Sequence, residues 1–100
     1  MIKIYFLSIY QPGKSYIDKV ILQVNTVITV NTTNFPVGSK LINNVNQARG
    51  FVVNAYANTF GNYVELRNVR KTFATGDALV LSTDAAVTAN VVSEIGRAHV

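Results

Sequence analysis

The sequence predicts an all-β protein, a small barrel or sandwich of about six to seven short antiparallel strands. Val, Ile, Thr, Tyr and Phe are abundant among its 100 residues, and these side chains suit a pleated, half-buried surface. Short apolar runs are separated by turn residues at intervals of about 8–12 residues. A turn phrase, Phe-x-x-Gly followed by Leu and a β-branched residue, also occurs twice, which indicates an internal repeat.

The repeated phrase begins at Phe35 and again at Phe73. Gly38 and Gly76 stand at the same position in each copy, and glycine suits a turn residue with positive φ. Each copy then restarts a strand on apolar residues, with Asp77 directly after the second glycine. We therefore expect both phenyl rings to be buried in the core, and both glycine turns to serve structure rather than chemistry.

The N-terminal segment, residues 1–24, is open between strand and helix. Residues 1–9 form an apolar run that ends at the turn residues 11–14, which favours a strand and a turn. Ser15 and Asp18 have the spacing of a helix capping box, and apolar residues follow at helical spacing. Most of those apolar residues are β-branched, which favours a strand.

Residues 25–93 form the predicted β module. From Val24 to Val30 apolar and polar residues alternate, as in a strand with one face on a core. Gly50, inside a later strand, predicts a bulge or the close approach of a neighbouring backbone. The expected strands cover residues 24–30, 39–43, 48–54, 63–69, 78–81 and 88–92.

The last residues, Ile95 to Val100, resemble the translation of a common sequencing adapter. That resemblance makes residues 94–100 a tail derived from read-through, and a longer natural protein is then expected beyond Ser93. His99 is the only histidine, and on this interpretation it is not a functional residue.

No catalytic, cofactor or metal site is expected, and we do not expect an enzyme. The four carboxylates that precede the predicted tail, Asp18, Glu65, Asp77 and Asp84, show no spacing typical of a calcium loop or of a catalytic pair. The chain also lacks a phosphate-binding loop and a nucleophile elbow. The apolar run at residues 4–10 is too short to span a membrane and lacks a cleavage site, so no membrane partner is expected.

The expected surface contacts are cations and tyrosines around the central hairpin. The net charge of +4 is mild, and most cations are scattered along the chain, so solvation explains them better than binding to nucleic acid. Nucleic acid is therefore not the expected partner. The residues concerned are Arg49, Tyr56, Tyr63, Arg67, Arg70 and Lys71.

Residues 27–92 resemble small β modules in the baseplate and tail structural proteins of contractile-tailed, myovirus-type phages. The segments that carry the resemblance are residues 28–30, 35–38, 48–53, 63–69 and 72–77, with their two Phe-x-x-Gly turns and an Asn-Val strand between. Lys71 stands where these modules often have glycine, and residues 1–24 do not contribute to the match.

The resemblance implies a structural protein of the virion, located in the particle, whose partners are other tail or baseplate subunits. Two alternatives remain open. One is a tail module that contacts a carbohydrate or receptor, such as a host glycan, which stacked surface aromatics at Tyr56 and Tyr63 would favour. The other is a small barrel that binds single-stranded nucleic acid, which a continuous positive groove would favour.

Overall fold

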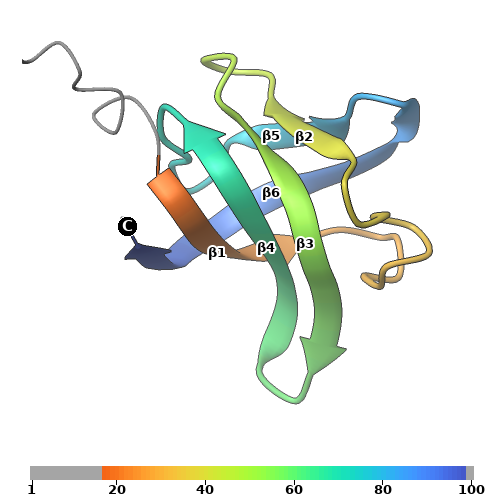
Figure 1. Ribbon diagram of the computed structural model, residues 1–100. Coiled ribbons are helices and arrows are strands. Elements are labelled where there is room, and N and C mark those ends of the chain that lie inside the picture. The colour runs from red at the N-terminus through yellow and green to blue at the C-terminus, as the bar shows by residue number, and fades with distance from the viewer. Residues whose placement is uncertain (1–16, 99–100) are drawn as a thin grey trace, which may run out of the picture.

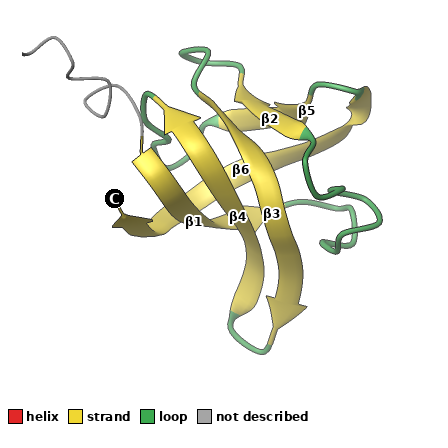
Figure 2. Cartoon of the chain, in the orientation of Figure 1, coloured by secondary structure: helices red, strands yellow, loops and turns green. Residues whose placement is uncertain are grey.

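A computed structural model describes residues 17–98, which form a closed antiparallel β-barrel (Figure 1). The predicted fold class is confirmed, and the barrel is the correct choice between the two predicted architectures. No helix occurs in the described part of the chain (Figure 2). The strands are β1 (Ile17–Asn25), β2 (Lys40–Asn43), β3 (Arg49–Asn58), β4 (Gly61–Arg70), β5 (Ala78–Leu81) and β6 (Asp84–Ala98).

Part of the ambiguous N-terminal segment is now resolved in favour of strand. β1 begins at Ile17 and pairs with both β4 and β6, so the β-branched content of this stretch prevails over its helical spacing. The expected strand over residues 1–9 and the turn at 11–14 lie outside the described residues, and so does His99.

The barrel interior is filled by the apolar side chains that alternate along each strand. In β2 and β5 every second residue is buried, as the two-residue period of a strand requires. Phe35 and Phe73 lie in the same core, with 0% and 4% of their surface exposed. The expectation that both rings of the repeated phrase are buried is confirmed.

The strand order reveals a pseudo-two-fold symmetry. Around the barrel the strands follow the order β1-β4-β3-β2-β5-β6. Exchanging β1 with β4, β2 with β5 and β3 with β6 reproduces the same set of neighbours. The barrel is therefore two copies of one three-strand unit, and the repeated phrase precedes the second strand of each.

Backbone hydrogen bonds repeat in the two halves. Gly38 N–H donates to the Val52 carbonyl at 2.8 Å, and Gly76 N–H donates to the Val91 carbonyl at 2.7 Å. The two glycines have φ angles of 89° and 91°, the region that favours glycine. The recurrence of the phrase in the sequence thus reflects a recurrence of the same turn in space.

One expected strand is wrong: residues 26–30 form a loop, although their alternation predicts a strand. β1 ends at Asn25. The Thr26 hydroxyl then donates to the Thr88 carbonyl at 2.6 Å and accepts from the Ile28 N–H. The Thr26 hydroxyl thus holds the chain through one bond to a distant strand and one to its own loop. The alternate apolar residues Ile28 and Val30 pack against the core from this loop.

Gly50 lies at a bulge, as its position predicts, and side chains of a neighbouring strand, rather than its backbone, come close to it. The pairing of β3 with β4 shifts between Arg49 and Phe51, which marks a bulge. A Cβ atom at Gly50 would lie 2.8 Å from Cγ2 of Val69 and 3.0 Å from Cβ of Leu66. Side chains of the adjacent strand β4 therefore lie too close to this backbone for any side chain at position 50.

β6 is longer than expected and closes the barrel. Its first half pairs with β5, and its second half, from Asn90 onward, pairs with β1. The residues 94–98 of the predicted read-through tail continue this strand, and Ala98 is the register partner of Lys19. Both ends of the described chain thus lie at one edge of the barrel, while the β3–β4 hairpin projects from it (Figure 1).

Candidate interaction surface

The two repeated turns are equivalent in backbone but differ in their side-chain bonds. In the second turn an Asp77 carboxylate oxygen accepts from the Ala74 N–H at 2.9 Å and from Asn43 Nδ2 at 2.7 Å. Asn43 is fully buried, and its Oδ1 accepts from the Val45 N–H at 2.8 Å. This polar network joins the end of β2 to the turn before β5.

The bonds to Asp77 explain its acidity. The bond from the Ala74 N–H, followed by that from Asn43, lowers the pKa of the Asp77 carboxyl below its ordinary value, because both donors favour the charged form. One donor belongs to the turn and the other to the end of β2, so these bonds attach the turn to the barrel.

Chemistry-bearing clusters are absent from the described residues. No group of three or more His, Cys, Asp or Glu side chains within residues 17–98 could hold a metal ion. No helix of that part is long and apolar enough to cross a membrane.

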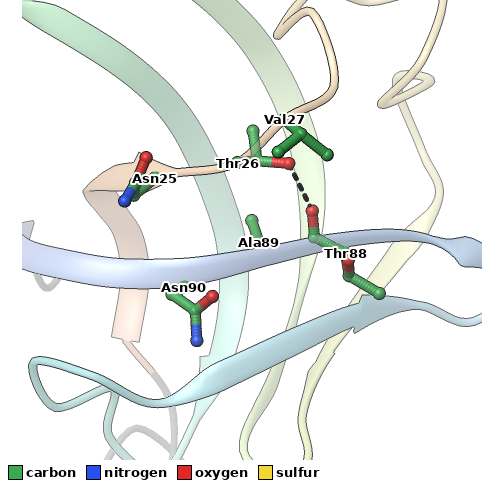
Figure 3. A pocket seen from close by; sticks show the side chains of 6 residues that line it. All are labelled: Asn25, Thr26, Val27, Thr88, Ala89 and Asn90. Atoms are coloured by element: carbon green, nitrogen blue, oxygen red, sulfur yellow. Dashed lines mark hydrogen bonds between the residues drawn. The ribbon is translucent and has the colours of Figure 1, made fainter.

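A shallow depression of about 210 Å³ lies beside the closing strand β6 (Figure 3). Asn25, Thr26 and Val27 line one side of it, and Thr88, Ala89 and Asn90 line the other. Its polar groups are neutral amides and hydroxyls, and Thr26 uses its hydroxyl to bind the Thr88 carbonyl. It has neither the titratable groups nor the depth of a catalytic cleft.

The outer surface of strands β2, β3, β4 and β1 carries a more distinctive arrangement. In the register of the barrel, Lys40 lies opposite Phe51, Phe51 opposite Arg67, and Arg67 opposite Lys19. These side chains follow one another across four strands, since directly opposed residues of an antiparallel pair share a face. Inward neighbours such as Val52 and Leu66 are buried, so the row points outward.

A second row runs beside the first, where Arg49 lies opposite both Ile42 of β2 and Arg70 of β4. β1, β4 and β3 lie side by side at the front of the barrel in Figure 1. We call the outer surface formed by Lys19, Lys40, Arg49, Phe51, Arg67 and Arg70 the basic face.

Acidic groups are sparse on this face. Lys19 Nζ forms an ion pair of 3.3 Å with Glu65, which lies between the first row and the tyrosines along β4. Of the other carboxylates whose side chains are described, Asp77 directly precedes β5, and Asp84 and Glu94 lie on β6. The outer side of β1–β4 therefore carries the described cations Lys19, Lys40, Arg49, Arg67 and Arg70 against one described carboxylate, Glu65, although the cations are scattered in the sequence.

The tyrosines occupy the projecting part of the same sheet. Tyr56 of β3 and Tyr63 of β4 are register partners, and their rings stack with centroids 5.4 Å apart and planes at 29°. Partial burial, followed by the Glu65 carboxylate, raises the pKa of the Tyr56 hydroxyl. Both effects disfavour the phenolate form of Tyr56.

The structure brings together most of the contact residues expected from the sequence. Tyr56 and Tyr63 form the stacked pair, and Arg49, Arg67 and Arg70 lie on the basic face. Lys71 does not join them, because it follows β4 and its Nζ donates to the Asn46 carbonyl at 3.0 Å.

Two cations of the basic face, Lys19 and Lys40, were not among the expected contact residues. They come from β1 and β2 and reach the face only through strand pairing. For Lys40, the only local signal was its position in a short strand whose alternate residues are apolar and buried, which places the Lys40 side chain on the outer side.

Comparison of the sequence with protein-family models, curated proteins and solved structures finds no match.

Proposed function

We propose that the protein is a structural module that acts by joining subunits of a larger assembly, a baseplate or tail of a phage particle. The resemblance of residues 27–92 to such modules motivates this proposal, and the filled barrel supports it. The interior is occupied by apolar side chains, so ligands and partners must be met on the outer surface. Packed cores of this kind supply rigidity.

The observation that carries the proposal is the exposed edge of β3 in the projecting hairpin. β2 pairs with β3 only from Arg49 to Phe51, and Val52 bonds to the turn at Ser39. Beyond it, residues 53–58 have no described strand on that side. An unpaired strand edge is a template for a strand from another chain.

The hairpin adds an apolar tip to this edge. Phe60, in the turn between β3 and β4, has 81% of its surface exposed. An exposed aromatic ring next to an open edge resembles the anchor residues that dominate binding at protein interfaces. A partner strand along β3 would cover both features together.

The test removes one hydrogen-bond donor from the edge. The Ala55 N–H donates a hydrogen bond to the side-chain Oδ1 of Asn54 at 2.9 Å. Because it does not bond to β4, this N–H faces the open side of β3. Ala57, two residues further along, faces the same way. Ala57→Pro removes that outward N–H without breaking the β3–β4 ladder, and Ala57→Thr is the matched control that keeps it.

Co-expression with the proteins encoded beside this gene provides the assay. We expect the unmodified chain and Ala57→Thr to co-purify with a partner, and Ala57→Pro and Phe60→Ala to lose it while remaining folded by circular dichroism. Co-purification of all four chains alike would show that the edge is not the interface. A failure of every neighbouring protein to bind the unmodified chain would refute the assembly role.

The stacked tyrosines favour a second candidate, a module that contacts a glycan. Exposed aromatic surfaces suit the apolar faces of sugar rings, and the 5.4 Å pair of Tyr56 and Tyr63 offers one outside the core. Screening immobilised glycans with the unmodified chain, Tyr63→Ala and Phe60→Ala tests it. We expect only Tyr63→Ala to lose binding, and equal retention by all three chains would exclude the tyrosine surface.

A further inference from the structure

We propose that the basic face binds single-stranded nucleic acid. This inference is independent of the proposed assembly role, because it concerns another surface and is tested on the purified chain alone. It follows from the strand register, which turns cations that are distant in sequence into two adjacent rows.

The first row alternates charge and aromatic surface. Lys40, Phe51, Arg67 and Lys19 are successive partners across β2, β3, β4 and β1. Neighbouring strands are about 4.8 Å apart, so the row extends over roughly 14 Å. It is therefore long enough to contact more than one nucleotide of an extended strand.

The fold holds like charges directly opposite each other at two places on this face. Arg67 is the partner of Lys19, and Arg49 is the partner of Arg70. Opposed like charges destabilise a sheet. At the first place Glu65 lies 3.3 Å from Lys19 and offsets part of the repulsion. A bound polyanion would relieve this repulsion.

Phe51 makes nucleic acid the best-fitting polyanion. Its ring is half-buried on the outside of the barrel, with Lys40 on one side and Arg67 on the other. A base can stack on such a ring while the flanking cations contact phosphates, which is how sequence-tolerant single-strand binders work. Stacking requires an unpaired base, so a single strand fits and a duplex does not.

The stacking element distinguishes this ligand from other anions. An acidic protein or an anionic polysaccharide would use the cations but would gain little from one isolated ring. The contribution of Phe51 is therefore the property that the experiment must measure, together with the number of phosphates neutralised.

Fluorescence anisotropy with a labelled oligothymidine of about 15 nucleotides measures both quantities. For single strands, the logarithm of the association constant falls with the logarithm of salt concentration by about 0.7 for each phosphate neutralised. Contacts from about four cations predict a slope near −3. The same oligonucleotide annealed to its complement should bind more weakly at equal salt.

Two matched pairs of variants assign the binding to this face. Arg67→Gln should reduce the slope by about 0.7, whereas Thr83→Glu makes the same change in net charge on the exposed β5–β6 turn and should leave the slope unchanged. Phe51→Ala should weaken binding by about 5- to 150-fold with its slope retained. Phe51→Tyr should keep most of the affinity, and Phe60→Ala, which removes an aromatic ring outside the face, should not change it.

Several results would overturn the proposal. If the protein bound the single strand and the duplex equally well, or if Phe51→Ala kept full affinity, bases would not stack on the Phe51 ring. Polyglutamate or heparin binding as tightly as the oligonucleotide would identify a general anion surface. An equal loss of slope in Arg67→Gln and Thr83→Glu would show that net charge, rather than the basic face, attracts the strand.

Discussion

The two buried rings of the repeated phrase allow the sharpest test of the fold. Phe35 and Phe73 are 0% and 4% exposed, whereas Phe60 is 81% exposed. Replacement of a buried phenylalanine by alanine removes its transfer free energy and leaves a cavity, and it usually costs about 3–5 kcal/mol. We therefore expect Phe35→Ala and Phe73→Ala each to lower the free energy of unfolding by that amount, and Phe60→Ala to lower it by less than about 0.5 kcal/mol.

Such losses are large compared with the total stability of a small domain, about 5–15 kcal/mol. For a chain of this size each kcal/mol shifts the melting temperature by about 4–8 °C, so each core variant should melt at least about 12 °C lower. The double variant should be unfolded or close to it. Because the two turns are equivalent in the pseudo-two-fold barrel, the two single losses should agree within about 1 kcal/mol.

Urea unfolding followed by far-ultraviolet circular dichroism gives the free energies, and an unchanged denaturant slope confirms that each variant starts from the same folded state. The exposed Phe60 is the internal control. If either core variant lost less than about 1 kcal/mol, or if Phe60→Ala lost as much as they do, the rings of Phe35 and Phe73 would not be the buried core residues that the barrel shows.

The remaining predictions concern the glycine turns and the buried polar network. Gly38→Ala and Gly76→Ala should each lower the free energy of unfolding by about 1–3 kcal/mol, because both residues have a positive φ angle and open space around them. Gly96 also has open space around it but does not have a positive φ angle, so Gly96→Ala should be nearly neutral in the same urea titration. Asn43→Ala should lower the stability measured by thermal unfolding by about 1–3 kcal/mol, since it removes the buried bonds to Asp77 and to the β2–β3 loop. An unchanged melting temperature would show that this network does not stabilise the fold. The folded pKa of Asp77 is lowered, so its stabilisation is complete above the ordinary carboxyl pKa and is lost as the pH falls through the folded value. Asp77→Asn should therefore show a smaller fall in stability between about pH 6 and about pH 2 than the unmodified chain, and equal falls would assign the acid sensitivity to other groups.

Local features of the fold could be predicted from the sequence because local chemistry decides them. The positive φ of Gly38 and Gly76 follows from the turn phrase, and the bulge at Gly50 follows from a glycine within a strand. The loop at residues 26–30 could not be predicted from its alternation. Its conformation depends on a bond from Thr26 to Thr88, a residue that is remote in sequence.

The basic face is a property of register, and register is a long-range quantity. Lys40, Phe51, Arg67 and Lys19 belong to four strands, and a shift of one residue in any pairing would turn its side chains to the other side of the sheet. Sequence reasoning could therefore identify the cations and the aromatic residues, but not that they form rows. The pseudo-two-fold arrangement was visible only as the repeated phrase.

The pairing of Lys19 with Ala98 makes the barrel suited to rearrangement of its chain order. Opposed residues in adjacent strands lie about 5 Å apart, so a short glycine-rich linker could join the end of β6 to the start of β1 without stretching the sheet. A circular permutant opened at the exposed Thr59–Phe60 turn should then keep every barrel strand. By the same geometry, the unit can be carried as an insertion in the loop of another domain, because its entry and exit points coincide.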